Sequence, residues 1–340
     1  MQAVINSPFT VGKAILQKEL KEHEFRNDVF TITQHYYKCK DTGQEFTNDE
    51  VDQVNVNQVY NQYREKYGVP FLDEIKDIRI KYGLPATKMS EILGFGVNTY
   101  RQYEQGDIPS VSNGRLIMAA DDPKEFKSFL EASKHVLDEN NYKKISKRVE
   151  EHINERKQKW LDEVFIPNYI FQNTKSNHLT GYKKPNLERI AQVISLFSKK
   201  VNNLWITKLN KLLFYTDFLH FNRTGFSICG ISYRAIQLGP VPATYDKIYN
   251  TLVDYGFAEK QFEQFDNGNY GEYLKGLVDY IDEDFLDSEK RVLNDVLDKL
   301  GSMGSNEIVE YSHKEKVWLE CEKERKVISY REYGFDLNNF

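Results

Sequence analysis

Residues 84–106 read LPATKMSEILGFGVNTYRQYEQG and carry the clearest structural pattern in the chain. Apolar residues recur at helical spacing on both sides of Gly94, which predicts two short helices joined by a turn. The inward residues, which we expect to form a core between the two helices, are Met89, Ile92, Leu93, Tyr100 and Tyr103. The helices should therefore pack at an angle across the turn.

The outward face of this helix pair carries polar residues that suit DNA. A helix-turn-helix of this shape fits the major groove, where Arg pairs with guanine and Asn or Gln pairs with adenine. Free N–H groups at the start of the first helix, and polar groups beyond the turn at 106–109, can anchor phosphates. The expected DNA contacts are Thr87, Lys88, Val97, Asn98, Thr99, Arg101, Gln102, Ser110 and Asn113.

This segment resembles the lambda-repressor/Cro type of helix-turn-helix. The shared features are Leu84, the Leu93-Gly94 pair, the Tyr103–Gly106 ending and Pro109-Ser110 after it. Together with the run 57–70, residues 88–104 look like MqsA-type antitoxins, over about residues 1–125. That resemblance implies a homodimeric repressor that binds operator DNA.

The charge of the helix-turn-helix region leaves a second interpretation open. Residues 70–120 contain six Lys or Arg and six Asp or Glu, so the region has no net positive charge to attract DNA. A helix-turn-helix that makes only protein contacts is the alternative.

A zinc finger precedes this module in MqsA-type proteins, and the sequence here departs from that pattern. Only the segment 37–43 remains of it, without a Cys-x-x-Cys pair. Tetrahedral zinc needs about four N or S ligands, which His23, His35 and Cys39 do not supply. We therefore expect a finger-like fold without a metal, and Cys39 as an ordinary half-buried thiol.

The C-terminal half contains three further patterns. The run 205–219 predicts an amphipathic helix, 229–238 has the residue types of a strand, and 239–242 predicts a stiff turn that projects outward. Pro242 should open a helix that ends near Asp254 before Gly256. A last helix is expected from about residue 310, with His313 and Trp318 not on quite the same face.

These patterns look like the Panacea domain, also called SocA-like, over about residues 185–335. The matching motifs are Lys208–Tyr215, Gly239–Pro242 with Tyr245, and Ser312-His313 with Trp318. The resemblance implies an antitoxin module that binds its toxin directly. The toxin contacts that it implies are Lys208, Lys211, Tyr215, Gly239, Pro240, Val241, Pro242, Tyr245, His313 and Trp318.

Catalysis has no comparable support in the sequence. The densest carboxylate group, 282–284, lies in a run from 259 to 299 with twelve Asp or Glu and five Lys or Arg. A solvated acidic surface explains that run, and an acidic patch that meets a basic toxin is the functional alternative. Neither a phosphate-binding loop nor a dinucleotide fingerprint occurs. We expect no enzyme activity and no cofactor.

Composition is consistent with a cytoplasmic protein of several domains. The chain has 340 residues and a net charge of −5. It has no apolar run of about 18 residues that could span a membrane. The three cysteines, odd in number and widely spaced, fit neither a disulfide framework nor a zinc quartet. The N-terminus lacks the features of a signal peptide.

The predicted fold class is mainly α with small β elements (α+β). The expected regions are 1–68 (degenerate zinc-finger-like), 69–137 (five-helix DNA-binding domain), 138–180 (helical linker) and 181–340 (Panacea domain). The predicted function is that of a type II antitoxin that neutralises a cognate protein toxin and represses its own operon. The alternative is a stand-alone transcriptional regulator whose C-terminal domain senses a ligand or oligomerises.

Overall fold

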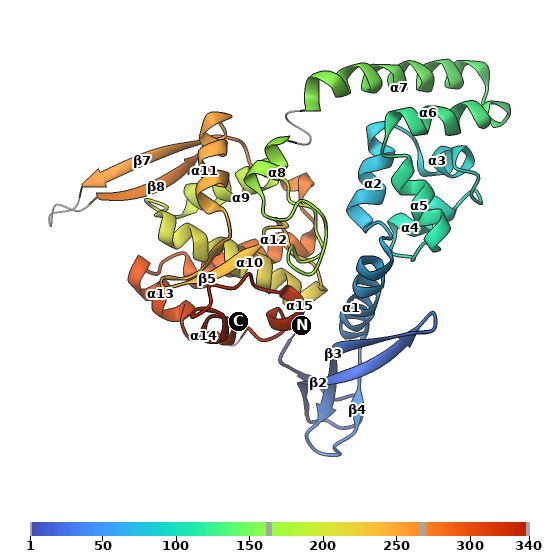
Figure 1. Ribbon diagram of the computed structural model, residues 1–340. Helices are drawn as coiled ribbons and strands as arrows, with labels where there is room; N and C mark the ends of the chain where they lie inside the picture. Colours follow the sequence, from blue (N-terminus) through green and yellow to red (C-terminus); the bar gives the residue numbers. More distant parts are fainter. Residues whose placement is uncertain (1, 161–164, 265–269, 338–340) are drawn as a thin grey trace. The chain divides into compact units, whose positions relative to one another are not determined.

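The computed structural model describes residues 2–160, 165–264 and 270–337, without the side chains of 156–160. About half of the chain is helical, and the described strands form three antiparallel sheets (Figure 1), as expected for the α+β class. The chain divides into two compact units, 1–59 with 169–340, and 60–168. No helix in the described ranges combines the length and the apolar character that a membrane crossing requires.

The sequence has short β-like runs at 29–33 and 36–39, and the N-terminal sheet of the structure is larger than these runs. Its four strands follow the order β1-β2-β3-β4 and are Val4–Asn6, Lys13–Phe25, Asp28–Cys39 and Glu45–Phe46. β2 and β3 pair along their whole length and turn at Arg26 and Asn27, both with positive φ, as two-residue hairpin turns require. The sequence pattern did not predict β2, because this strand is exposed and rich in Lys and Glu, which are uncommon in strands.

Helix α1, Asp49–Tyr67, packs against β3, and two of its amide side chains bond to the backbone of that strand. Asn55 accepts a hydrogen bond from the His35 N–H and donates one to the His35 carbonyl, both at 2.8 Å. Gln58 makes the same pair of bonds with Thr33, at 2.9 and 2.8 Å. These amides take the place of a neighbouring strand and satisfy the backbone of β3.

The three side chains considered as zinc ligands do not converge. Cys39 pairs with Ala14 and His23 pairs with Phe30 in the same ladder. These pairs are nine residues apart along β2, which corresponds to about 30 Å. His35 is buried, and Cys39 accepts a hydrogen bond from the Ser7 hydroxyl at 3.1 Å.

Residues 60–168 form a helical unit around one apolar core. Its helices are α2 (Leu72–Lys81), α3 (Ala86–Ile92), α4 (Thr99–Glu104), α5 (Val111–Ala119), α6 (Pro123–Ala132) and α7 (Glu139–Trp160). The five inward residues predicted from the 84–106 segment are all buried in this core. Helix α7 also contributes Ile145 and Val149, so it packs with the other helices and is not an exposed linker.

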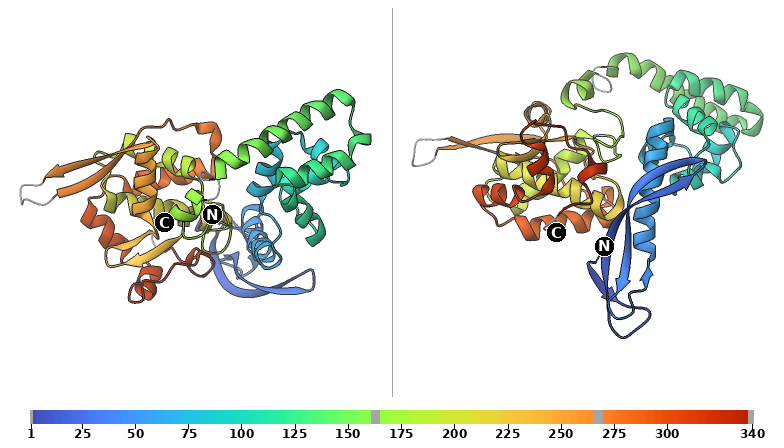
Figure 2. Two further views of the ribbon diagram at one scale, coloured as in Figure 1. Left: turned by 45° about the horizontal axis from the view of Figure 1, so that its top comes forward. Right: turned by 60° about the horizontal axis from the view of Figure 1, so that its bottom comes forward.

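The other unit contains the C-terminal elements arranged around one buried helix (Figure 2). That helix, α10, spans Ile206–Thr224, and every residue from 208 to 221 is buried. Around it lie β6, β8, α12 and α13. The elements of this region are α8 (Ile166–Ile170), α9 (Leu187–Lys200), β5 (Tyr233–Ile236), β6 (Gly239–Pro242), α11 (Tyr245–Asp254), β7 (Ala258–Gln264), β8 (Tyr270–Gly276), α12 (Asp287–Leu300), α13 (Ser305–Ser312), α14 (Lys316–Cys321) and α15 (Tyr330–Tyr333).

Three expectations for this region were wrong in detail. The predicted turn 239–242 is strand β6, which pairs with β5, and β5 is shorter than the strand expected over 229–238. The prolines of β6 are tolerated because each strand of a two-stranded sheet is an edge strand. Helix α11 begins at Tyr245, three residues later than expected. The single last helix is two helices, α13 and α14, with a turn between them.

Candidate functional site

The three motifs of the C-terminal domain converge at one buried point. Lys211, on α10, donates a hydrogen bond from Nζ to the Pro240 carbonyl of β6 at 2.9 Å. A Cβ atom on Gly239 would lie 2.3 Å from the Ser312 Oγ of α13 and 2.6 Å from the Lys211 Cε. We call these four residues, Lys211, Gly239, Pro240 and Ser312, the Lys211 cluster. Only a glycine fits between the two side chains, which explains the Gly-Pro pair at this position.

Burial controls the electrostatics of the two lysines on α10. Desolvation lowers the pKa of Lys211 to about 7, and no carboxylate pairs with it within the described residues. Lys208 donates to the Gly301 carbonyl at the end of α12 at 2.7 Å, and desolvation lowers its pKa as well. Both ammonium groups therefore bind backbone carbonyls and tie α10 to its neighbours.

Aromatic residues extend the Lys211 cluster toward the surface. Trp318, on α14, donates from Nε1 to the Ile236 carbonyl at the end of β5, at 2.8 Å. The His313 ring stacks on Trp318 with 3.7 Å between centroids. On a single helix the two residues would not lie on quite the same face, but the turn between α13 and α14 allows the two rings to stack.

Most of the predicted toxin contacts are buried. The seven without appreciable exposure are Lys208, Lys211, Tyr215, Gly239, Pro240, Val241 and Pro242. Tyr245, His313 and Trp318 are partly exposed. Most of the motif residues thus belong to the core of the domain. Of the ten predicted contacts, only Tyr245, His313 and Trp318 can touch a partner without rearrangement.

Residues 209–319 match the model of the family described as Antitoxin SocA-like, Panacea domain. The matched range, called the Panacea region below, contains the whole Lys211 cluster and confirms the sequence resemblance over that range. No match to the chain was found among curated proteins or among solved structures.

A buried carboxylate, Asp217, lies at the centre of the Panacea region and is absent from the predicted site. Its Oδ1 accepts hydrogen bonds from the N–H groups of Ile228 and Cys229, at 2.9 and 2.7 Å. Its Oδ2 accepts from the Tyr233 hydroxyl at 3.0 Å and from the Tyr330 hydroxyl at 3.4 Å. Burial raises the pKa of Asp217 to about 6, although these four bonds favour the charged form. The sequence feature that could have identified this residue is a single Asp in an otherwise apolar part of the helix.

The Panacea region is completed by residues outside the matched range. Tyr330, eleven positions beyond residue 319, also donates to the Ile231 carbonyl at 2.8 Å. Its ring stacks on Phe218 with 4.2 Å between centroids. The C-terminal segment is therefore part of the same core.

The predicted DNA contacts lie on the surface of the α3–α4 pair and the start of α5. Thr87, Val97, Asn98, Arg101, Gln102 and Ser110 are exposed, and Lys88, Thr99 and Asn113 are partly exposed. Some of them have internal partners. Lys88 pairs with Glu91 at 2.7 Å, and Ser110 caps α5 by accepting from the Asn113 N–H at 3.1 Å. Arg101 has no ion pair within the described parts of the chain, so its guanidinium is available to a ligand.

Proposed function

We propose that this chain is the antitoxin of a type II toxin-antitoxin system and neutralises a protein toxin through its C-terminal domain. The match of residues 209–319 to a family of antitoxin-type domains carries the proposal. The convergence of the three motifs on the Lys211 cluster supports the proposal, because these contacts stabilise the domain that would present a toxin-binding surface.

We propose further that the chain acts by occupying the toxin and not by chemistry. Lys208, Lys211 and Asp217 are engaged with backbone groups or tyrosine hydroxyls in the interior. Catalytic acids and bases need contact with a substrate, so this arrangement favours a structural role for them.

The test is co-expression with the product of the adjacent gene. Cells that die from that product alone should grow when the full-length chain is also made, and the two proteins should co-purify. An empty vector is the control for growth. Death of the cells despite the presence of the chain would refute the neutralising role.

A second proposed role is repression of the operon through the α3–α4 pair, acting as a homodimer. The exposed Asn98, Arg101 and Gln102 support it, since these side chain types read base edges. A gel shift with the promoter fragment tests it, and an unrelated DNA of equal length is the control. Equal binding to both fragments would leave no operator-specific role.

The rival function is a stand-alone transcriptional regulator with a sensing or oligomerising C-terminal domain. Both functions share the DNA-binding role, so promoter binding does not separate them. The genomic neighbourhood does, because only an antitoxin requires a small toxic gene beside it.

A further inference from the structure

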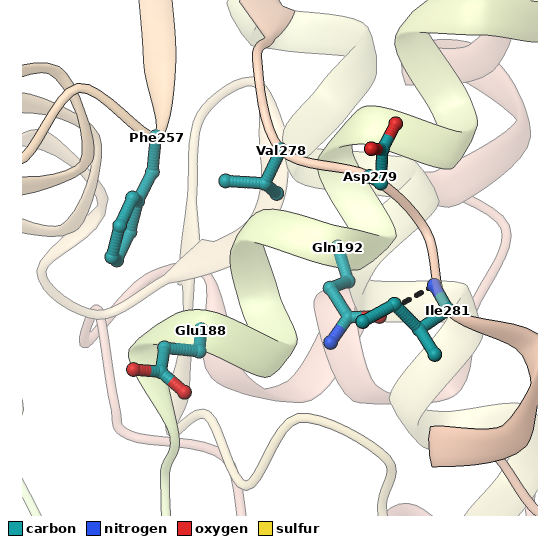
Figure 3. Close-up of a pocket in the computed structure, with 6 residues that line it drawn as sticks. All are labelled: Glu188, Gln192, Phe257, Val278, Asp279 and Ile281. Atoms are coloured by element: carbon teal, nitrogen blue, oxygen red, sulfur yellow. Dashed lines mark hydrogen bonds between the residues drawn. The ribbon is translucent and has the colours of Figure 1, made fainter.

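A groove of about 250 Å³ lies on the surface of the C-terminal domain beside α9 (Figure 3). Figure 3 shows Glu188 and Gln192 on the helix and the other lining residues on the chain segments that flank it. The lining consists of Glu188, Gln192, Phe257, Val278, Asp279 and Ile281. Phe257, Val278 and Ile281 make it apolar, and the two carboxylates lie at its sides.

Hydrogen bonds hold the flanking segments against α9. The Ile281 N–H donates to Gln192 Oε1 at 2.9 Å, and Gln192 Nε2 donates to Asp284 Oδ2 at 2.8 Å. The Leu277 N–H donates to the Phe257 carbonyl at 2.9 Å, which joins the two flanking segments. A groove that is already formed loses little entropy when a partner binds.

The surface around the groove exposes large apolar side chains. Ile281, which lines the groove, is 47% exposed, and Leu277, next to Val278 in the sequence, is 54% exposed. Exposed apolar residues that gather around a concave site are typical of interaction surfaces.

The charge of the same surface selects the kind of partner. Residues 277–287 contain five carboxylates and no Lys or Arg. Two of the five, Asp282 and Asp287, pair with Lys290 at 2.9 and 3.1 Å. Asp279 pairs with Lys199 at 3.5 Å, and both side chains are exposed. No ion pair engages Glu188 within the residues that the structure describes. Glu188 and Asp279 therefore give the groove a negative charge. This charge favours a partner with Lys or Arg and disfavours an acidic partner.

The groove is small for a ligand pocket. Pockets for small ligands have volumes of about 300–1,000 Å³, and this groove, at about 250 Å³, lies just below that range. Its apolar and acidic lining favours a protein side chain as the occupant. We propose that the groove receives an apolar side chain of the toxin, whose neighbouring Lys or Arg pairs with Glu188 and Asp279. This inference rests on the proposed antitoxin function and assigns that function a surface.

Two variants test the groove in the full-length chain. Ile281→Arg places a cation and extra volume where the apolar side chain would enter. Asp279→Lys reverses a charge in a segment outside regular secondary structure. The matched controls are Leu20→Arg, where Leu20 is 77% exposed, and Glu22→Lys, where Glu22 is also exposed; both lie on β2, outside the predicted toxin contacts.

The measurement is the dissociation constant for the purified product of the adjacent gene, at low and high salt. Ile281→Arg should weaken binding about 10- to 100-fold, as expected for a residue central to an interface. Asp279→Lys should weaken it less and should reduce the salt dependence, because exposed charges act through screened attraction. The two controls should bind like the wild type, and circular dichroism should show that all four variants are folded.

The possible results separate the two proposals. If the wild type binds the toxin and both groove variants bind equally well, the groove is not the interface, while the antitoxin function stands. If the wild type does not bind at all, the antitoxin function and the inference both fail. If native mass spectrometry shows a second copy or a small molecule that Ile281→Arg removes, that occupant replaces the toxin and the inference is overturned.

Discussion

Lys211 and Pro240 are joined by a hydrogen bond of 2.9 Å from a buried ammonium group to a backbone carbonyl. This bond connects the central helix α10 to strand β6, and Gly239 leaves the space that the lysine side chain occupies. Burying a lysine without a carboxylate is costly, so its contribution to stability should depend on pH.

The first prediction concerns this pH dependence. Burial lowers the pKa of Lys211 from 10.5 to about 7. Between these values the unfolded state binds more protons than the folded state, so stability rises with pH. The free energy of unfolding of the wild type, minus that of Lys211→Met, should therefore increase by roughly a few kcal/mol between about pH 7 and pH 10. Chemical denaturation at several pH values measures it, and a constant difference would contradict it.

The second prediction compares two glycines with positive φ. Gly239 has φ +96 and Gly256, after α11, has φ +70. A Cβ at Gly256 would meet nothing within 4 Å, whereas one at Gly239 would meet Ser312 and Lys211. Gly256→Ala should cost about 1–2 kcal/mol from the backbone alone. Gly239→Ala should cost about 1–3 kcal/mol more from overpacking. Denaturation curves compare the two, and equal losses would mean that the Lys211 cluster accommodates the methyl group.

The third prediction concerns the hydrogen bonds of Asp217. Asp217→Ala leaves the N–H groups of Ile228 and Cys229 buried without a partner, so we expect a loss of about 3 kcal/mol or more. Asp217→Asn keeps an oxygen that can accept both bonds and should cost much less. Thermal and chemical unfolding measure both, and similar losses would show that hydrogen bonding is not the reason that this residue is required.

The fourth prediction uses the raised pKa of the same carboxyl. Burial raises the pKa of Asp217 from 3.8 to about 6, so the folded state binds more protons between these values. The stability of the wild type relative to Asp217→Asn should therefore fall as the pH rises from about 4 to about 6, and then level off. Because other groups titrate equally in both proteins, their difference isolates Asp217. A difference that grows with pH in this range would have the wrong sign.

The fifth prediction addresses the DNA-binding surface. Arg101→Ala should weaken operator binding by about 1–3 kcal/mol if its guanidinium pairs with a guanine. Arg331→Ala is a matched control, because Arg331 is also exposed but lies on α15 in the other unit. Fluorescence anisotropy with a labelled promoter fragment measures both affinities. An unchanged affinity for Arg101→Ala would remove this residue from the interface.

Periodicity predicted the parts of the fold in which apolar residues face one core. In residues 48–67, apolar side chains recur at near-helical spacing, which predicts a helix, and α1 spans Asp49–Tyr67. The four residues of that pattern, Val51, Val54, Val59 and Tyr63, are buried. The inward faces of α3 and α4 were also predicted correctly. These elements follow an apolar stripe, which a single sequence displays directly.

The remaining errors come from polar residues that a distant partner brings into the interior. Three polar residues interrupt the apolar stripe of α10 and therefore look exposed in the sequence: Lys208, Lys211 and Asp217. In the structure all three are buried against carbonyls, N–H groups or hydroxyls. Those partners lie between eleven and more than one hundred positions away. The local sequence pattern does not show such pairings. The motif residues were therefore expected to be more exposed than they are in the structure.

The dependence of Asp217 on Tyr330 limits how this domain can be transplanted. A fusion that carried residues 209–319 alone would lack one of the hydroxyls that solvate the carboxylate and the ring that covers Phe218. The Tyr330 N–H also donates to the His178 carbonyl at 3.0 Å, so the exchangeable segment must extend upstream as well. A graft of this module onto a new carrier should therefore include both His178 and Tyr330, and should keep residues 1–59, which belong to the same compact unit.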